Sequence, residues 1–374
     1  MRAAPPALPS SPRLSPSPRL PPSPRLWFTG FWHKAEADAI RAENDLYRLL
    51  ARSFDVRLDA RDPDFLLYSF WDYRHYHYAC PRICWTGENK SPDFRECDWA
   101  FSFEPTRGRN FHLPFWSLLT DPQAMPPPPA NLRAELARKT RFCAFVYWNP
   151  HAPTRNLFYK ILSQYKPVDA AGEVYQNCAA PSPRYAADWV ARLTQYYRRC
   201  KFVIAFENCS AEGYTTEKLA LPLMAHAVPI YWGNPHAARH FHPQAFINAH
   251  DFDSLESLAR YVQKVDQDDA LYRRYLAAPK YVNGRVPRDA DWQVIAARFA
   301  RIFATSVTPV AERDPWRWSG RRFWPRGLQK KFGRARRAQS DVRQRCLQKE
   351  FVSPLRSQKI VAPDGAQKSI AKAR

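Results

Sequence analysis

The feature that most constrains the fold of this chain is an alternation between short apolar runs and segments whose apolar residues recur at helical spacing. In the second half of the sequence, apolar runs of strand length lie at 142–148, 201–206 and 228–232. Helical spacing covers 155–165, 188–200 and 216–226. Strands that alternate with helices in this way predict an α/β unit with a mainly parallel sheet.

The first half repeats the same rhythm on a smaller scale. A strand is predicted at 26–28 and an amphipathic helix over 39–50. Further short apolar runs follow at 54–58, 65–68, 83–85 and 99–103. A methionine and four consecutive prolines then occupy 125–129, which no compact helix or strand can contain. We therefore place the linker between two domains there.

The chain has 374 residues, which is long for a single core. We predict two Rossmann-like α/β domains, at 26–124 and 130–305, that face each other across a cleft. In such folds ligands bind at the carboxyl ends of the strands. Composition and fold by themselves name no reaction.

Residues 1–25 carry the unit Ser-Pro-Arg-Leu three times, beginning at Ser11, Ser17 and Ser23. So dense a proline run predicts an extended, disordered tail. No apolar run has the length of a signal peptide core or of a membrane span, which needs roughly 18 residues. We therefore expect a cytoplasmic protein without a transmembrane anchor.

Charge predicts an anionic partner. Lys and Arg number 57 against 35 Asp and Glu, a net charge of +22. Basic residues interleave with aromatic ones in the predicted tail at 306–374, and Leu328, Phe332 and Ala335 lie on one helical face. We favour peripheral contact with an anionic membrane surface over a solvated charge run, and both over nucleic acid. A basic binding protein without enzymatic activity is the alternative reading.

The eight cysteines are scattered and several lie in apolar runs, which favours buried, reduced thiols. His75, His77, Cys80 and Cys84 fit no common zinc spacing. The three Asp-x-Asp runs, which begin at Asp62, Asp251 and Asp289, are short enough to occur by chance. No metal is predicted, and the run at Asp251 is expected to cap a helix beginning near Ser254.

The most informative stretch runs from 201 to 218 and is followed by 227–235. A buried strand ends at Phe206, and a polar loop leads to a helix whose N-cap is Thr215 or Thr216. A helix N-terminus with Lys218 beside it suits a diphosphate. Glu217 suits the two hydroxyls of a ribose, although a capping role explains it equally well.

This stretch resembles the signature of the α1,3-fucosyltransferases, glycosyltransferase family 10, and its bacterial members in particular. The matching segments are Phe-Glu-Asn at 206–208, Tyr-Thr-Thr-Glu-Lys at 214–218, Val-Pro-Ile-Tyr-Trp-Gly at 228–233, Trp-Thr-Gly-Glu-Asn-Lys-Ser-Pro at 85–92 and Arg-Asn-Leu-Phe-Tyr at 155–159. The resemblance spans roughly 27–303 and implies the two-domain fold called GT-B. One departure is Pro222, which should kink or shorten the helix after Lys218.

The resemblance implies roles for six residues. Arg155 and Lys218 should neutralise the diphosphate of GDP-fucose, Asn208 and Tyr214 should hydrogen-bond it, and Glu217 should hold the ribose. Glu88 is the candidate base of an inverting transfer.

The substrates are implied in the same way. GDP-fucose is the donor, and no cofactor or metal is required. The acceptor is expected to be N-acetylglucosamine or glucose in a lactosamine-type glycan. Transfer through an α1,3 or α1,4 linkage would give Lewis-type products in glycan or lipopolysaccharide-type biosynthesis.

Overall fold

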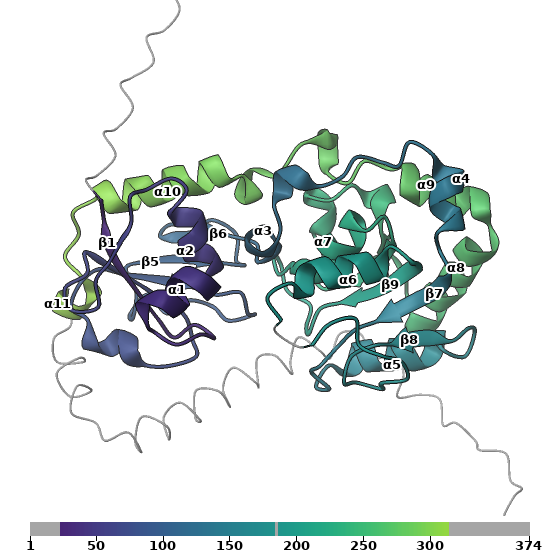
Figure 1. The fold of residues 1–374 in the computed structure, drawn as a ribbon, viewed down its shortest axis with the longest axis horizontal. Coiled ribbons are helices and arrows are strands. Elements are labelled where there is room, and N and C mark those ends of the chain that lie inside the picture. The colour runs from purple at the N-terminus through teal and green to yellow at the C-terminus, as the bar shows by residue number, and fades with distance from the viewer. Residues whose placement is uncertain (1–22, 184–185, 314–374) are drawn as a thin grey trace, which may run out of the picture.

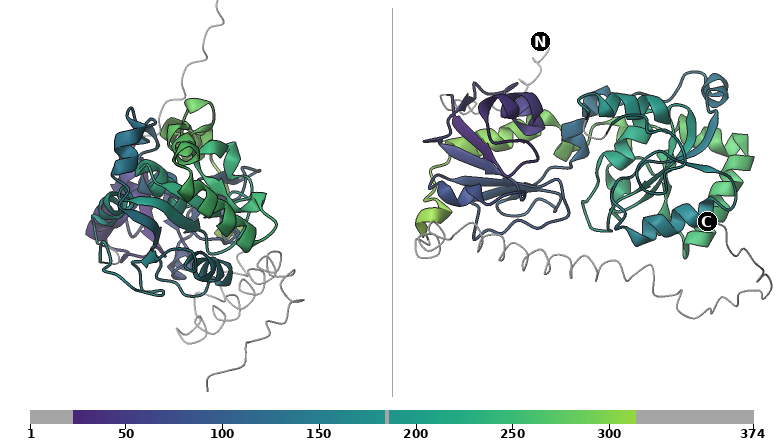
Figure 2. Two further views of the ribbon diagram at one scale, coloured as in Figure 1. Left: turned by 90° about the vertical axis from the view of Figure 1, so that its right-hand side faces the viewer. Right: turned by 60° about the horizontal axis from the view of Figure 1, so that its bottom comes forward.

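The strands of this chain form two separate sheets in the computed structural model, which describes residues 23–183 and 186–313 (Figure 1). Each sheet, with the helices around it, makes one of two units that lie side by side (Figure 2). Every strand pair in the two sheets is parallel, as the sequence predicted. The predicted tails at 1–25 and 306–374 lie outside the described residues, apart from 23–25 and 306–313.

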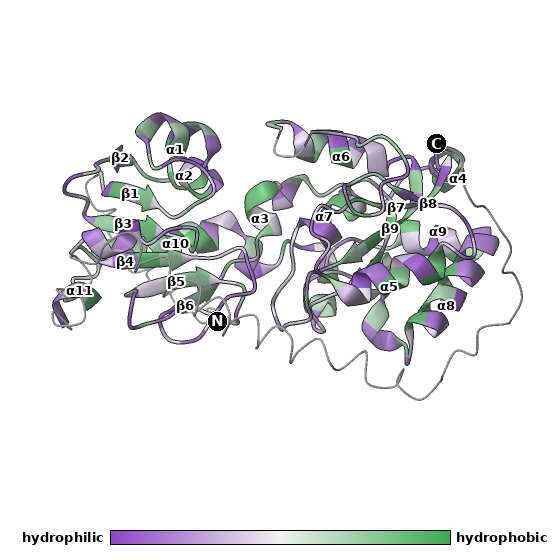
Figure 3. Cartoon of the chain, turned by 90° about the horizontal axis from the view of Figure 1, so that it is seen from below, coloured by the Kyte–Doolittle hydropathy of each residue, from purple (hydrophilic) through white to green (hydrophobic). Residues whose placement is uncertain are grey.

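The first sheet has six strands in the order β2-β1-β3-β4-β5-β6. Every residue of β3 and β4 is buried, which explains why these central strands read as continuous apolar runs. Figure 3 shows that the strands of both sheets are mainly hydrophobic. The bounds are β1 Arg25–Thr29, β2 Arg57–Leu58, β3 Phe65–Tyr68, β4 Arg82–Trp85, β5 Trp99–Ser102 and β6 Asn110–His112.

The helix predicted over 39–50 is two helices, α1 (Ala37–Glu43) and α2 (Asp45–Leu50). Asn44 separates them in an extended conformation, with φ −93° and ψ 106°. Its side-chain oxygen accepts a hydrogen bond of 2.8 Å from the backbone N–H of Tyr47 and so caps α2. The apolar spacing thus predicts the helical segment correctly, and the capping Asn44 divides it into two helices.

The second sheet has five strands in the order β11-β10-β9-β7-β8. Alternate residues of β7 face different helices: Phe145 packs in one apolar cluster with α5 and α8, and Ala144 packs in another with α6 and α7. The strands are β7 Arg141–Phe145, β8 Val168–Ala170, β9 Cys200–Phe206, β10 Val228–Trp232 and β11 Ile247–Asn248. The helices are α5 Pro153–Leu162, α6 Trp189–Tyr197, α7 Glu217–Met224, α8 Leu255–Gln267 and α9 Asp269–Ala277.

The connection between the units contains the short helices α3 (Trp116–Leu119) and α4 (Leu132–Ala137), with the proline run between them. The chain later returns to the first unit through α10 (Trp292–Ala304), whose Phe299 ring stacks on Phe101 at 4.1 Å. The predicted boundary at 305 groups α10 with the second unit, whereas its apolar residues pack in the first core. A short helix α11 (Val310–Arg313) follows.

The structure also tests the predictions about cysteines, the cap of α8 and membrane spans. All seven cysteines within 23–183 and 186–313 are free thiols and five are buried, as expected. Ser254 itself caps α8 through a capping box with Ser257, so the predicted cap at Asp251 or Asp253 is wrong. Within the same described ranges, no helix has the length and apolar character needed to cross a membrane.

Candidate active site

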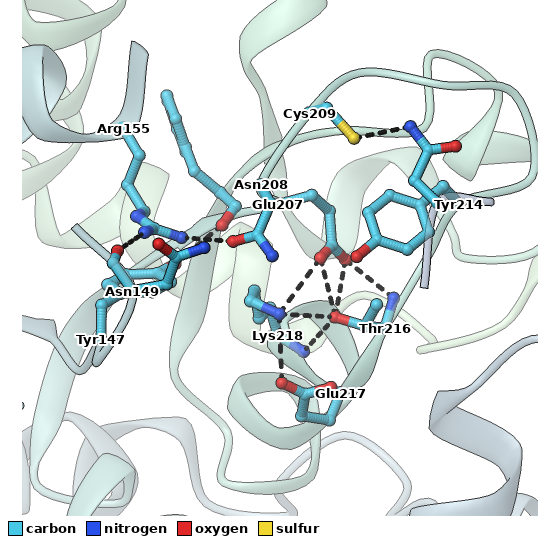
Figure 4. A network of polar contacts seen from close by, with 12 residues as sticks. Tyr147, Asn149, Arg155, Glu207, Asn208, Cys209, Tyr214, Thr216, Glu217 and Lys218 are labelled. Carbon is cyan, nitrogen blue, oxygen red and sulfur yellow. Dashed lines mark hydrogen bonds and ion pairs between the residues drawn. The ribbon is translucent and has the colours of Figure 1, made fainter. Parts of the chain in front are cut away.

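The carboxyl end of β9 and the N-terminus of α7 are joined by a buried carboxylate. Glu207, the first residue after β9, is fully buried and accepts hydrogen bonds from the Thr216 backbone N–H at 2.7 Å and from its hydroxyl at 2.8 and 2.9 Å. Thr216 is the N-cap of α7. The motif 206–218 therefore folds so that its two ends meet, which fixes the first turn of α7 against the strand (Figure 4).

Lys218 lies between two carboxylates at this helix end. Its Nζ is 3.3 Å from Glu207 and 3.2 Å from Glu217. Burial alone would lower the pKa of Lys218, but the charges of Glu217 and Glu207 raise it well above its ordinary value. Burial raises the pKa of Glu207, and the charge of Lys218 opposes that shift. The ammonium is thus held charged and in place.

Arg155 supplies a second cation from the first turn of α5. It is completely buried, and its guanidinium lies over the ring of Tyr147, 3.9 Å from the ring centre. One nitrogen donates to Oδ1 of Asn208 at 2.9 Å, and another donates to the carbonyl of Asn149. Its Nε has no hydrogen-bond partner among the described residues. A buried, unpaired donor on a fixed cation is what a phosphate oxygen would satisfy.

Loops from the two units come into close contact beside these cations. Gly213 has φ +77°, and a Cβ at this position would lie 2.0 Å from the carbonyl oxygen of Phe103 in the first unit. Only glycine permits this approach. Next to it, the ring of Tyr214 packs edge-on against Phe103, with ring centres 5.6 Å apart. A further contact joins Nδ2 of Asn89 to the Cys209 thiol at 2.7 Å. The carboxyl edges of the two sheets therefore meet at this site.

Glu88 reaches the site from the first unit, in the turn after β4. The Thr86 hydroxyl fixes this turn, since it donates to the Glu88 carbonyl at 2.9 Å and accepts from the Glu88 N–H at 3.1 Å. Glu88 remains accessible to solvent. The surrounding protein nevertheless desolvates its carboxyl enough to raise the pKa, and the charge of Lys218 opposes that rise.

Burial and the negative charge of Glu88 both raise the pKa of Tyr214. Glu88 is therefore close enough to act electrostatically on both Tyr214 and Lys218. The structure brings all six predicted site residues to this junction, from opposite sides. Their individual roles remain predictions.

A cluster that the sequence analysis did not anticipate lies on the border of the site. His112, His240 and Asp289 have ligand atoms within 4.8 Å of one another, and this is the one such group found in the described part of the chain. Burial and the neighbouring His112 lower the pKa of His240 to about 4. Burial alone would raise the pKa of Asp289, yet hydrogen bonds from His112 and Arg298 lower it to about 2.

Two of these ligand groups are already engaged within the protein. Asp289 accepts from Arg298 at 2.9 Å, and Nε2 of His112 lies 3.3 Å from the Gly213 carbonyl. A guanidinium on the carboxylate disfavours a second cation there. We read the cluster as a contact between the units.

Sequence reasoning missed several residues that shape the site. Glu207 belongs to the Phe-Glu-Asn motif, but nothing in the sequence indicates that its carboxylate bonds Thr216, nine residues later. Tyr147 lay in a run assigned as strand, although β7 ends at Phe145. Pro222, which was predicted to kink or shorten its helix, lies inside α7, and α7 ends at Met224, two residues before the predicted end at 226.

Two family models match the chain. The model described as Glycosyltransferase family 10 (fucosyltransferase) C-term matches residues 136–299. The model described as Alpha-(1,3)-fucosyltransferase FucT N-terminal domain matches residues 26–119. The two matched regions coincide with the two sheets and contain all six predicted site residues.

Relatives and solved structures agree with this assignment. The chain is 30% identical over 215 residues to Alpha-(1,3)-fucosyltransferase FucT of Helicobacter pylori, covering 49% of this chain and 43% of that protein. It is 35% identical over 170 residues to human 4-galactosyl-N-acetylglucosaminide 3-alpha-L-fucosyltransferase FUT6, covering 44% and 42%. The chain thus spans less than half the length of each of these two relatives.

A crystal structure of an alpha1,3-fucosyltransferase with GDP-fucose superposes with a TM-score of 0.62 at 22% identity. The superposition covers 80% of this chain and 96% of that one, which shows that the two share a fold. Models of an N-terminal and a C-terminal part of fucosyltransferases therefore match consecutive regions of this chain, and the chain shares its fold with a solved alpha1,3-fucosyltransferase. The chain belongs to glycosyltransferase family 10, the fucosyltransferases.

Proposed function

We propose that this protein is an inverting fucosyltransferase that transfers L-fucose from GDP-fucose to a hydroxyl of N-acetylglucosamine or glucose in a lactosamine-type glycan. The donor is supported by the GDP-fucose named for a structural neighbour. The acceptor is supported by the galactosyl-N-acetylglucosaminide named for the human relative. An α1,3 linkage is the first expectation and α1,4 the second.

The observation that carries the proposal is the separation of charge across the junction. Two held cations, Arg155 and Lys218, lie on the side of the second unit, and a carboxylate with a raised pKa, Glu88, reaches in from the first. Cations that are fixed before the reaction stabilise the charge that develops on a departing diphosphate. A carboxylate with a raised pKa is better suited to accept a proton near neutral pH.

The transfer follows from this arrangement. Glu88 takes the proton of the acceptor hydroxyl while the oxygen attacks C1 of fucose. The bond from C1 to the diphosphate oxygen breaks, and its electron pair leaves with GDP, whose negative charge Arg155 and Lys218 balance. Attack from the face opposite the leaving group inverts the configuration at C1. Glu217, the first residue of α7, is the residue we assign to the ribose hydroxyls.

The test is an assay of the purified protein with a panel of nucleotide sugars and N-acetyllactosamine, in which GDP release and product mass are followed. Of the nucleotide sugars, we expect only GDP-fucose to give a product, heavier by one fucose residue, and we expect the Glu88→Gln variant to form it far more slowly. Transfer from another nucleotide sugar, with GDP-fucose left intact, would contradict the proposal. The alternative of a binding protein without enzymatic activity is not favoured, because both matching family models describe an enzyme.

The basic segment beyond 313 lies outside the described residues, so its role stays a proposal from composition. Its interleaved basic and aromatic residues support contact with an anionic membrane surface on the cytoplasmic side. Sedimentation with vesicles that contain phosphatidylserine, compared with neutral vesicles, tests this. Removal of 314–374 should abolish the difference while leaving GDP release intact.

A further inference from the structure

Two tryptophans of the first unit are exposed, whereas every other Phe, Tyr and Trp of that unit is buried or partly buried. Trp32 is 47% exposed and Trp71 is 57% exposed. With Tyr175, they are the large apolar side chains that stand out from the described surface. A tryptophan left half in water at a defined position is a common element of ligand sites, because its ring offers a large, rigid contact area.

Both tryptophans lie at the point where the strand order of the first sheet reverses. From β1 the chain goes to β2 on one side, and then to β3 on the other side of β1. In open parallel sheets, ligands bind outside the carboxyl ends of the two strands at such a switch point. Trp32 follows β1 by three residues and Trp71 follows β3 by three residues. The backbone N–H of Trp71 donates a hydrogen bond of 3.0 Å to the backbone carbonyl of Gly30, so the loops after β1 and β3 lie side by side.

Trp32 is also connected to the turn of the candidate base. Its ring centre lies 5.6 Å from that of Trp85 and 6.3 Å from that of Phe115. A Cβ on Gly87 would lie 3.0 Å from each of these same two rings. Gly87 directly precedes Glu88, so Trp32 and the turn that leads to Glu88 pack against the same two rings.

No aromatic ring of the described chain lies parallel to the Trp32 ring. Its four aromatic neighbours, Phe31, His33, Trp85 and Phe115, meet it at angles between 66° and 82°. These contacts fix the orientation of the indole without covering it in parallel. An indole that is held in this way and is 47% exposed can receive the flat face of a pyranose ring, whose C–H groups pack against aromatic surfaces while its hydroxyls stay free to react or to hydrogen-bond.

We propose that Trp32 is the platform on which the acceptor sugar stacks, and that Trp71 contacts the next sugar of the acceptor. The site takes a disaccharide, with the reacting ring on Trp32 next to Glu88 and the second ring toward Trp71. The identification of the ligand as an acceptor rests on the proposed function, but the saccharide site itself can be tested without catalysis.

The experiment measures binding of free N-acetylglucosamine and of N-acetyllactosamine to the full chain loaded with GDP, by saturation-transfer NMR titration. The variants are Trp32→Ala, Trp32→Phe and Trp71→Ala. We expect Trp32→Ala to weaken both sugars about tenfold and Trp32→Phe to recover most of that loss. Trp71→Ala should weaken the disaccharide and leave the monosaccharide unchanged. GDP affinity, measured in parallel, should be equal in all variants.

The proposal is overturned if Trp32→Ala binds both sugars as the wild type does, or if the wild type binds neither at millimolar concentration. The experiments distinguish a failure of this proposal from a failure of the proposed function. If sugar binding depends on Trp32 but the protein never consumes GDP-fucose, the sugar platform is supported and the transferase function is contradicted. If Trp32→Ala transfers fucose with an unchanged acceptor KM, the transferase function is supported and the platform is contradicted.

Discussion

Nε2 of His112 lies 3.3 Å from the carbonyl oxygen of Gly213, and this contact joins the last strand of the first sheet to the loop that carries Tyr214. The other ring nitrogen, Nδ1, lies 3.2 Å from Asp289, just before the returning helix α10. One imidazole therefore connects three segments that are far apart in sequence.

Because His112 and Asp289 act as one unit, their substitutions should not be additive. We expect His112→Ala and Asp289→Asn each to lower the free energy of unfolding, and the double variant to show a coupling of about 0.5–3 kcal/mol. Urea unfolding of the four proteins of the cycle measures this. Additive effects would mean that the two side chains contribute independently.

Glu88→Gln should remove the general base. We expect kcat to fall by about two to four orders of magnitude with little change in the KM for GDP-fucose. In the wild type, protonation of Glu88 should lower kcat/KM as pH falls, and since the pKa is raised this acid limb should lie above that of an ordinary glutamate. The pH profile of the residual activity of Glu88→Gln should lack this decrease in kcat/KM at low pH.

Stability provides the control for Glu88→Gln. A carboxyl whose pKa is raised in the folded state binds its proton more tightly folded than unfolded, so its contribution to stability falls as pH rises through that range. The glutamine variant escapes this loss. Its melting temperature at neutral pH should therefore equal or exceed that of the wild type, and a large decrease would show that inactivity reflects unfolding.

Arg155→Lys should weaken the donor specifically. Lysine retains the positive charge but lacks the planar guanidinium. It therefore cannot bond Asn208 and the Asn149 carbonyl while presenting a further donor, as Arg155 does with its unpaired Nε. Loss of a charged hydrogen bond corresponds to about 1.5–3 kcal/mol, or roughly tenfold to a hundredfold in GDP affinity by calorimetry. Arg192→Lys, in the exposed Asp188 pair of α6, is the matched control and should bind GDP normally.

Thr216 should matter through its hydroxyl. Thr216→Ala removes the hydroxyl hydrogen bond shared between the two Glu207 oxygens and the cap of α7, and should lower the free energy of unfolding by about 1–2 kcal/mol. Thr216→Ser keeps the hydroxyl and should recover most of this loss in thermal unfolding. Equal destabilisation by serine and alanine would point to the methyl group instead.

Chelation should leave the enzyme active. His112 and Asp289 already bond to protein groups, and Arg298 places a positive charge on the carboxylate. We expect EDTA treatment followed by dialysis to change neither GDP release nor the melting temperature. Activity that disappears and returns with a divalent cation would show that this cluster, or another part of the chain, holds a metal.

Local rules in the sequence determined much of this protein. The continuous apolar runs placed β3, β9 and β10 to within one residue, because a strand buried on both faces is apolar along most of its length. The cap threonine and the cation of α7 were visible in the same way, since a helix start depends on a few neighbouring residues. The break at Asn44 was local too and was missed because the apolar spacing continues across it.

Only the tertiary structure decided which distant residues meet. Glu207 is buried against Thr216, α10 returns to the first core, and His112 reaches Gly213, a residue 101 positions away. Such contacts depend on strand order and on the packing of whole elements, which no short window of sequence contains. For the same reason the two exposed tryptophans acquire meaning only once β1 and β3 are seen to be neighbours.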